Sequence, residues 1–168
     1  IAIISLKGED IFLSSVKSTA EHTWTLLLAL IRNLPGSFEH VKMRGWNRTL
    51  FTANELDNKT LGIIGFGRLG TIIADYANAF NMTILANDIN SRAKCKPDYV
   101  TFTTLNDLLT RSEFVLLMIS YTKDNDNFMD EDKFNRMQTG SVFINISRGE
   151  HCNEDDLLKN LQKGKLAG

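Results

Sequence analysis

The segment 60–80, TLGIIGFGRLGTIIADYANAF, constrains the fold of this chain more than any other stretch. A short apolar run leads into three glycines, Gly65, Gly67 and Gly70, which have the spacing G-x-G-x-x-G. Apolar residues then recur at helical spacing, at Leu69, Ile72, Ile73, Tyr76, Ala77 and Phe80. A strand, a glycine turn and an amphipathic helix in this order predict one β-turn-α unit, whose helix begins inside the turn.

This unit has the features that binding of a dinucleotide requires. Gly65 permits the tight turn, Gly67 lets the backbone approach a pyrophosphate, and Gly70 lets the helix pack closely on the strand. The amino end of the helix adds free amides and the positive end of its dipole. Asp88 follows about 20 residues after the loop, where a carboxylate accepts hydrogen bonds from the ribose hydroxyls. We therefore predict a dinucleotide site, against the alternative of a glycine turn that serves packing alone.

The acidic side chain favours NAD over NADP. A carboxylate at Asp88 would repel the 2′-phosphate of NADP. Three basic residues follow closely, at Arg92, Lys94 and Lys96, and they keep NADP open as the less favoured cofactor.

Strand-like and helix-like segments alternate along the rest of the chain. Apolar runs predict strands at 1–5, 60–65, 82–88, 99–102, 114–120 and 141–147. Helices are predicted at 18–33, 69–80, 105–111, 130–137 and 153–163. Because the strands are apolar on both faces, we expect an α/β fold, a Rossmann-type doubly wound parallel sheet with helices on both faces.

Local signals set the expected helix ends. Ser18 or Thr19 is the expected N-cap of the first helix, and LPGS at 34–37 is expected to end it, since proline breaks a helix. Asn153 is the expected N-cap of the last helix, with Asp156 in the capping-box position.

Composition excludes several functional classes. The chain has 168 residues, 43% of them hydrophobic, and a net charge of −1, so we expect neither nucleic acid nor a membrane as partner. Its longest apolar stretch, 26–31, is far too short to span a bilayer. Cys95 and Cys152 do not form a CxxC pair, which favours a reducing compartment, the cytoplasm. We expect no metal site.

Four segments in order, STAEHTW at 18–24, LGIIGFGRLG at 61–70, INISRGE at 144–150 and GKLAG at 164–168, resemble the D-isomer-specific 2-hydroxyacid dehydrogenases. The resemblance implies an oxidoreductase that transfers a hydride between a nicotinamide cofactor and the CH–OH group of a small D-2-hydroxy acid. It also implies that residues 1–16 end a substrate-binding domain and that 17–168 form an NAD-binding domain, incomplete at its C-terminal end. A homodimer through the helix at 19–34 is a further implication.

The resemblance assigns the catalytic role to Arg148, which would bind the substrate carboxylate and polarise its keto or hydroxyl group. The chemistry agrees, because a guanidinium offers a planar fork of donors that matches a carboxylate. A surface ion-pair arginine is the alternative. The expected cofactor contacts are Gly65, Gly67, Arg68, Leu69, Gly70, Asp88, Ile119, Ser120, Ile146 and Ser147.

Two departures from the family pattern also produce expectations. The family has a proline in the loop at 118–122, and its absence here is expected to loosen that loop. The family's proton-transferring histidine and its glutamate would lie beyond Gly168, so the 168 residues alone are expected to have no turnover.

Other conspicuous residues receive structural roles. His151 is interpreted as a loop residue, His22 as a structural or interface residue, and Cys152 as buried or inert. Trp24 and Trp46 are interpreted as packing anchors. Two further functions stay open at this point: a non-enzymatic NAD-binding corepressor-like protein, and another Rossmann-type enzyme such as a methyltransferase or an epimerase.

Overall fold

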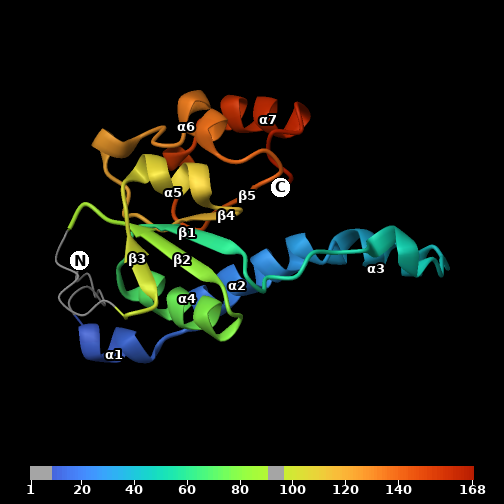
Figure 1. Ribbon diagram of the computed structural model, residues 1–168, viewed down its shortest axis with the longest axis horizontal. Coiled ribbons are helices and arrows are strands. Elements are labelled where there is room, and N and C mark those ends of the chain that lie inside the picture. Colours follow the sequence, from blue (N-terminus) through green and yellow to red (C-terminus); the bar gives the residue numbers. More distant parts are fainter. Residues whose placement is uncertain (1–8, 91–96) are drawn as a thin grey trace, which may run out of the picture.

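The computed structural model describes residues 9–90 and 97–168, and a five-stranded parallel sheet forms its centre (Figure 1). The strands lie in the order β3-β2-β1-β4-β5, and every neighbouring pair is parallel. Their bounds are Thr60–Ile64 for β1, Thr83–Asn87 for β2, Val100–Phe102 for β3, Phe114–Leu117 for β4 and Val142–Asn145 for β5. The predicted Rossmann-type α/β fold is confirmed.

The strand order reverses at β1. The chain runs outward from β1 to β2 and β3, then crosses back to place β4 on the other side of β1 and β5 beyond it. Ile64, the last residue of β1, therefore pairs with Asn87 on one side and with Leu117 on the other. Loops that leave adjacent strands in opposite directions open a crevice at this edge, where sheets of this kind bind ligands.

Helices cover both faces of the sheet (Figure 1). One face is covered by α2 Ser18–Ile31 and α4 Arg68–Ala79. The opposite face is covered by α5 Leu105–Arg111, α6 Glu131–Arg136 and α7 Glu154–Gln162. Alternate residues of the strands feed two hydrophobic clusters. Ile63 belongs to the cluster that contains Ile73 of α4, whereas its neighbour Ile64 belongs to the one that contains Leu108 of α5. Burial on both faces explains why these strands are continuously apolar.

The predicted break near residue 34 exists, but a second helix follows it directly. Helix α2 ends at Ile31, Asn33 adopts a left-handed φ of 47°, and α3 then spans Leu34–Lys42. The first helix thus ends before LPGS, but the sequence did not predict the second helix, in which Pro35 lies in the first turn, where no intrahelical N–H is needed. The predicted caps Ser18 and Thr19 were also wrong, since Lys17 is the N-cap of α2.

Helix α3 projects away from the sheet as an arm (Figure 1). None of its residues is buried, and the arm and the 3₁₀ helix Arg48–Phe51 after it carry exposed apolar side chains: Phe38, Val41, Met43, Trp46 and Leu50. Trp46 is 95% exposed, so its predicted role as a packing anchor was wrong. Trp24, by contrast, is buried and meets Tyr76 and Phe80 edge-on, which confirms that role.

The C-terminal residues return to the outer edge of β5. Asn153 accepts a hydrogen bond from the amide of Asp156 and caps α7 as predicted. After α7, the amide of Ala167 donates to the carbonyl of Ser141, and the amide of Phe143 donates to the carbonyl of Gly168. The predicted strand at 1–5 lies outside the described residues. Within the described ranges, no helix combines the length and apolarity that crossing a bilayer requires.

Candidate functional site

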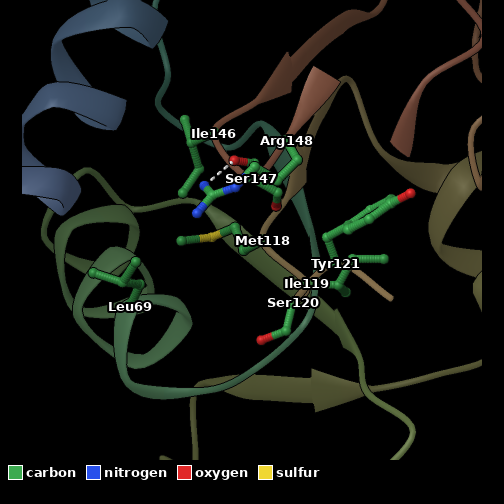
Figure 2. Close-up of a pocket in the computed structure, with 8 residues that line it drawn as sticks. All are labelled: Leu69, Met118, Ile119, Ser120, Tyr121, Ile146, Ser147 and Arg148. Atoms are coloured by element: carbon green, nitrogen blue, oxygen red, sulfur yellow. Dashed lines mark hydrogen bonds between the residues drawn. The ribbon is translucent and has the colours of Figure 1, made fainter. Parts of the chain in front are cut away.

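A pocket of about 490 Å³ opens where the strand order reverses (Figure 2). Its volume is within the range of small-molecule sites. Three segments build it, the start of α4 and the exits of β4 and β5, which supply Leu69, Met118, Ile119, Ser120, Tyr121, Ile146, Ser147 and Arg148. Five of the predicted cofactor contacts and the predicted catalytic arginine thus lie around one pocket: Leu69, Ile119, Ser120, Ile146, Ser147 and Arg148.

The glycine loop brings α4 against the ends of β1 and β4. Gly65 has a φ of +93°, and a Cβ there would lie 2.8 Å from the carbonyl oxygen of Met118. A Cβ on Gly70 would lie 2.8 Å from the carbonyl oxygen of Gly65. Both contacts are closer than a Cβ tolerates, so these two positions require glycine.

Gly67 differs, because a Cβ there would meet no atom within 4 Å. It is the N-cap of α4, and no side chain caps the helix at this end. The first amides of a twelve-residue helix therefore face open space beside the pocket, which is the environment that a pyrophosphate needs. The residues present fit a dinucleotide here.

Asp88 holds the glycine loop through its carboxylate. Its Oδ2 accepts a hydrogen bond of 2.7 Å from the amide of Phe66, and its Oδ1 accepts one of 2.7 Å from the amide of Asn90. An ionised carboxylate offers about four acceptor positions, so both oxygens keep capacity for hydroxyl donors. The sequence located this residue but not its contact with the loop.

Arg68 points away from the pocket. Its Nη1 donates to the carbonyl oxygen of Val16 over 2.7 Å, which directs the guanidinium to the short link between α1, Asp10–Ser15, and α2. Only the backbone of Arg68 lies in the glycine loop, at the first residue of α4. Leu69, the next residue, lines the pocket.

Asn125 holds the exit of β4, where the sequence predicted a loose loop. The Oδ1 of Asn125 accepts a hydrogen bond of 2.8 Å from the amide of Thr122, and its Nδ2 donates to the carbonyl oxygen of Ser120 over 2.8 Å. The missing proline is expected to loosen this loop, and the side chain of Asn125 adds two hydrogen bonds that hold it. Its amide supplies two tethers that a sequence pattern centred on proline does not reveal.

Arg148 is exposed at the exit of β5 and turns toward Ile146 and Met118 over the pocket (Figure 2). Its Nη1 donates to the carbonyl oxygen of Ser147 over 2.8 Å. Among residues 9–90 and 97–168, no carboxylate forms an ion pair with it. The surface ion-pair alternative finds no support, and most donors of the guanidinium fork remain available to a ligand.

His151, which the sequence suggested to be a loop residue, lies in a short 3₁₀ helix and is buried. It ends the 3₁₀ helix Gly149–His151, its side chain is completely buried, and its ring meets that of Tyr121 at 5.4 Å. Neither ring nitrogen has a hydrogen-bond partner, and the residue does not line the pocket. Within the part of the chain that the structure describes, no cluster of His, Cys, Asp or Glu could hold a metal ion.

Comparisons with known proteins identify the family. A family profile described as "D-isomer specific 2-hydroxyacid dehydrogenase, NAD binding domain" matches residues 24–168. The chain belongs to the D-isomer-specific 2-hydroxyacid dehydrogenases. It is 35% identical over 152 residues to D-3-phosphoglycerate dehydrogenase of Bacillus subtilis, covering 90% of this chain and 29% of that protein. It is 33% identical over 159 residues to a glyoxylate reductase of Thermococcus onnurineus, covering 90% of this chain and 48% of that protein.

Solved structures also match the fold. The D-lactate dehydrogenase of Aquifex aeolicus, complexed with NAD and lactic acid, superimposes with a TM-score of 0.86 at 34% identity, covering 92% of this chain and 47% of that one. An acyclic imino acid reductase in complex with NADPH and D-Arg gives a TM-score of 0.85 at 26% identity, covering 92% of this chain and 50% of that one. The chain thus spans about half or less of these four relatives. The family match excludes the methyltransferase and epimerase alternatives.

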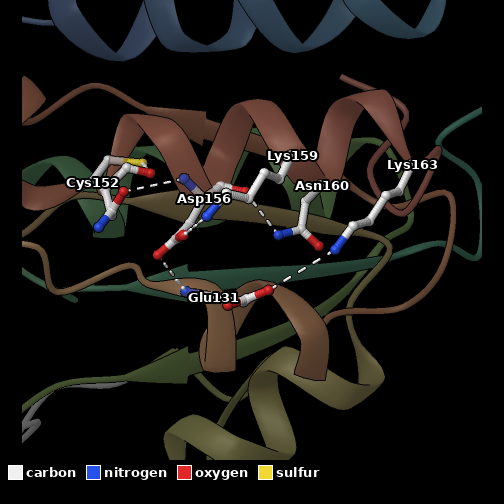
Figure 3. A network of polar contacts seen from close by, with 7 residues as sticks. Glu131, Cys152, Asp156, Lys159, Asn160 and Lys163 are labelled. Carbon is white, nitrogen blue, oxygen red and sulfur yellow. Dashed lines mark hydrogen bonds and ion pairs between the residues drawn. The ribbon is translucent and has the colours of Figure 1, made fainter.

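Cys152 generates a prediction about thiol reactivity. Burial raises the pKa of its thiol to about 11, and the negative charges of Glu154 and Asp156 add to the effect. Figure 3 shows the residue beside the first turn of α7, close to Asp156. At pH 8 only about one thiol in a thousand is ionised at such a pKa, so Cys152 is expected to react slowly with a disulfide reagent.

The measurement is the rate of reaction with 5,5′-dithiobis(2-nitrobenzoate) in a Cys95→Ser background, which leaves Cys152 alone. The rate should rise steeply as the pH increases toward 11, because the reactive thiolate is lost below the pKa, and it should reach that of a free thiol in denaturant. A fast reaction in the folded protein at pH 8 would contradict the assignment.

Proposed function

We propose that this chain binds NAD in the pocket and that the full-length protein transfers a hydride between the cofactor and a small D-2-hydroxy or 2-keto acid. One observation carries the proposal: within the described residues, the amino end of α4 has no capping side chain, the guanidinium of Arg148 has no carboxylate partner, and both border the same pocket. The first feature suits a pyrophosphate, and the second suits a carboxylate. The relatives named above are dehydrogenases and reductases, and nothing in the described residues favours the non-enzymatic corepressor alternative.

The chain's own residues account for substrate binding and orientation. Arg148 would bind the carboxylate of the acid and polarise its 2-oxygen. The positive guanidinium would thereby stabilise the negative charge that develops on this oxygen during reduction. Leu69, Ile119 and Ile146 add apolar surface to the pocket, which would strengthen that interaction where a bound acid displaces water. The nicotinamide, when bound, supplies the hydride acceptor or donor.

The proton of the hydroxyl group needs another residue. His151 is buried away from the pocket lining, so it is not a candidate for this transfer. In line with the family pattern, we assign the step to a histidine paired with a glutamate beyond Gly168. The 168 residues alone should therefore bind NADH without turnover, and steady dehydrogenase activity from them would contradict this assignment.

Domain organisation and assembly are part of the same proposal. We place residues 1–16 at the end of a substrate-binding domain and 17–168 in the NAD-binding domain of a cytoplasmic protein. A second copy of the chain would cover the helix at 19–34 and the apolar side chains of the adjoining arm, such as Phe38 and Val41, each 59% exposed. Sedimentation velocity of the full-length protein tests the homodimer, which a monomer at all concentrations would rule out.

Replacement of Gly67 by alanine tests the pyrophosphate site. Because the added Cβ meets no protein atom, Gly67→Ala should leave the folded state unchanged. It should raise the Kd for NADH about 10-fold or more, since the methyl group occupies the space that the phosphates would approach. Fluorescence titration measures the Kd, and thermal unfolding verifies the fold. Unchanged NADH affinity in a correctly folded variant would contradict the site.

The preference for NAD over NADP rests on Asp88, and Asp88→Asn tests it. The asparagine oxygen can still accept from the amide of Phe66, so the glycine loop keeps its tether while the negative charge is removed. The ratio of NADPH to NADH affinity should then increase about 10-fold. Titration with both cofactors gives the ratio. An unchanged ratio would shift the discrimination to other residues.

Arg148→Lys tests the substrate site. Lysine keeps the charge but lacks the planar fork, so kcat/KM of the full-length protein for glyoxylate with NADH should fall about 100-fold or more. The Kd for NADH should stay the same. Full activity of the lysine variant would reduce the role of Arg148 to a general positive charge.

A further inference from the structure

Two asparagines hold the loops that supply pocket residues after β4 and β5. Asn145 is the last residue of β5, and Asn125 ends the 3₁₀ helix Lys123–Asn125 that follows β4. Neither side chain lines the pocket. Each is half-buried, and each uses both ends of its primary amide on the backbone of the loop next to it.

The side chain of Asn145 forms two hydrogen bonds with the backbone of the turn that carries Arg148. Its Nδ2 donates to the carbonyl oxygen of Arg148 over 2.7 Å, and its Oδ1 accepts from the amide of Ser147 over 2.9 Å. The Oγ of Ser147 also donates to the carbonyl oxygen of Leu117 over 2.9 Å, which ties the turn to β4. The backbone of Arg148 is thus fixed from within its own loop and from the neighbouring strand.

The side chain of Asn125 likewise forms two hydrogen bonds with the backbone of the loop that follows β4. Its two hydrogen bonds join Thr122 to the carbonyl oxygen of Ser120, a residue of the pocket lining. The loop has no proline to restrict it, so this amide is the main local constraint on the backbone at Ser120 and Tyr121. One wall of the pocket therefore depends on Asn145 and the other on Asn125.

We propose that Asn145 and Asn125 are separate positioning residues, Asn145 for the arginine that receives the acid and Asn125 for the loop that receives the cofactor. This inference rests on the proposed function of the pocket. A primary amide suits both places because its one short planar group holds a donor next to an acceptor. Loss of either amide should displace its own wall and leave the other in place.

The experiment compares Asn145→Ala, Asn125→Ala and Asn106→Ala in the full-length protein. Asn106 is the matched control, because it is an exposed asparagine on α5 whose hydrogen bond to Arg136 lies away from the pocket. Amide hydrogen exchange reports directly on the hydrogen bonds between each asparagine side chain and the backbone of its loop. The amide of Ser147 should lose protection only in Asn145→Ala, and that of Thr122 only in Asn125→Ala.

Steady-state kinetics and NADH titration then measure how each substitution affects the acid and the cofactor. With glyoxylate and NADH as probes, Asn145→Ala should lower kcat/KM for the acid about 10- to 100-fold with the NADH Kd unchanged. Asn125→Ala should raise the NADH Kd about 10-fold, and saturating NADH should restore most of its kcat. Asn106→Ala should match the wild type in every measurement. Equal effects of the two pocket variants on acid and cofactor would overturn the separate roles.

The two parts of the experiment fail differently. A wild-type protein that neither binds NADH nor responds to Arg148→Lys would overturn the proposed function, while hydrogen exchange would still decide whether the two amides hold their loops. Unchanged hydrogen exchange at Ser147 in Asn145→Ala and at Thr122 in Asn125→Ala would overturn the positioning roles of the two asparagines, even in an active enzyme.

Discussion

The close approach of α4 to the ends of β1 and β4 is the contact on which the rest of the site depends. It requires a left-handed backbone at Gly65 and a missing side chain at Gly70, since a Cβ at either place would lie 2.8 Å from a carbonyl oxygen. Because this contact sets the start of α4, it also sets where the free amides of that helix point. Asp88 reinforces the arrangement through the amide of Phe66.

The parallel sheet brings the remaining site residues to the same edge. Strands β4 and β5 are buried and apolar, except for Asn145 at the end of β5. Their exits lie side by side because parallel strands end at the same edge, and this places Ser120 and Arg148 around one pocket although 28 positions of sequence separate them. The residues that line the pocket thus lie mainly in the loops after the strands, while the strands and the inner faces of the helices form the core.

Much of this could be predicted from the sequence, because the determining signals are local. The glycine spacing, the strands on both sides of it and the arginine after the last strand are all contiguous patterns, and the structure places them as expected. Asn153 was recognised as a cap for the same reason. The family match, which covers residues 24–168, supports the same interpretation.

The sequence-based predictions failed where tertiary contacts decide the conformation or the role of a residue. Pro35 is compatible both with the end of one helix and with the first turn of the next, and the sequence does not distinguish them. Trp46 looks like a core residue by composition, yet it follows an arm that leaves the sheet. The amides of Asn145 and Asn125 were not recognised at all, since asparagine in a loop has many uses and its partners are known only from coordinates.

The return of the chain to β5 affects how the sheet meets other molecules. Exposed strand edges are templates for unwanted pairing between chains, and a central parallel sheet has two of them. One edge is already occupied, because the segment that ends at Gly168 hydrogen-bonds to Ser141 and Phe143. The opposite edge is β3, only three residues long, which is too short to recruit a foreign strand efficiently. Within the described residues, little of the sheet edge is therefore left open to such pairing.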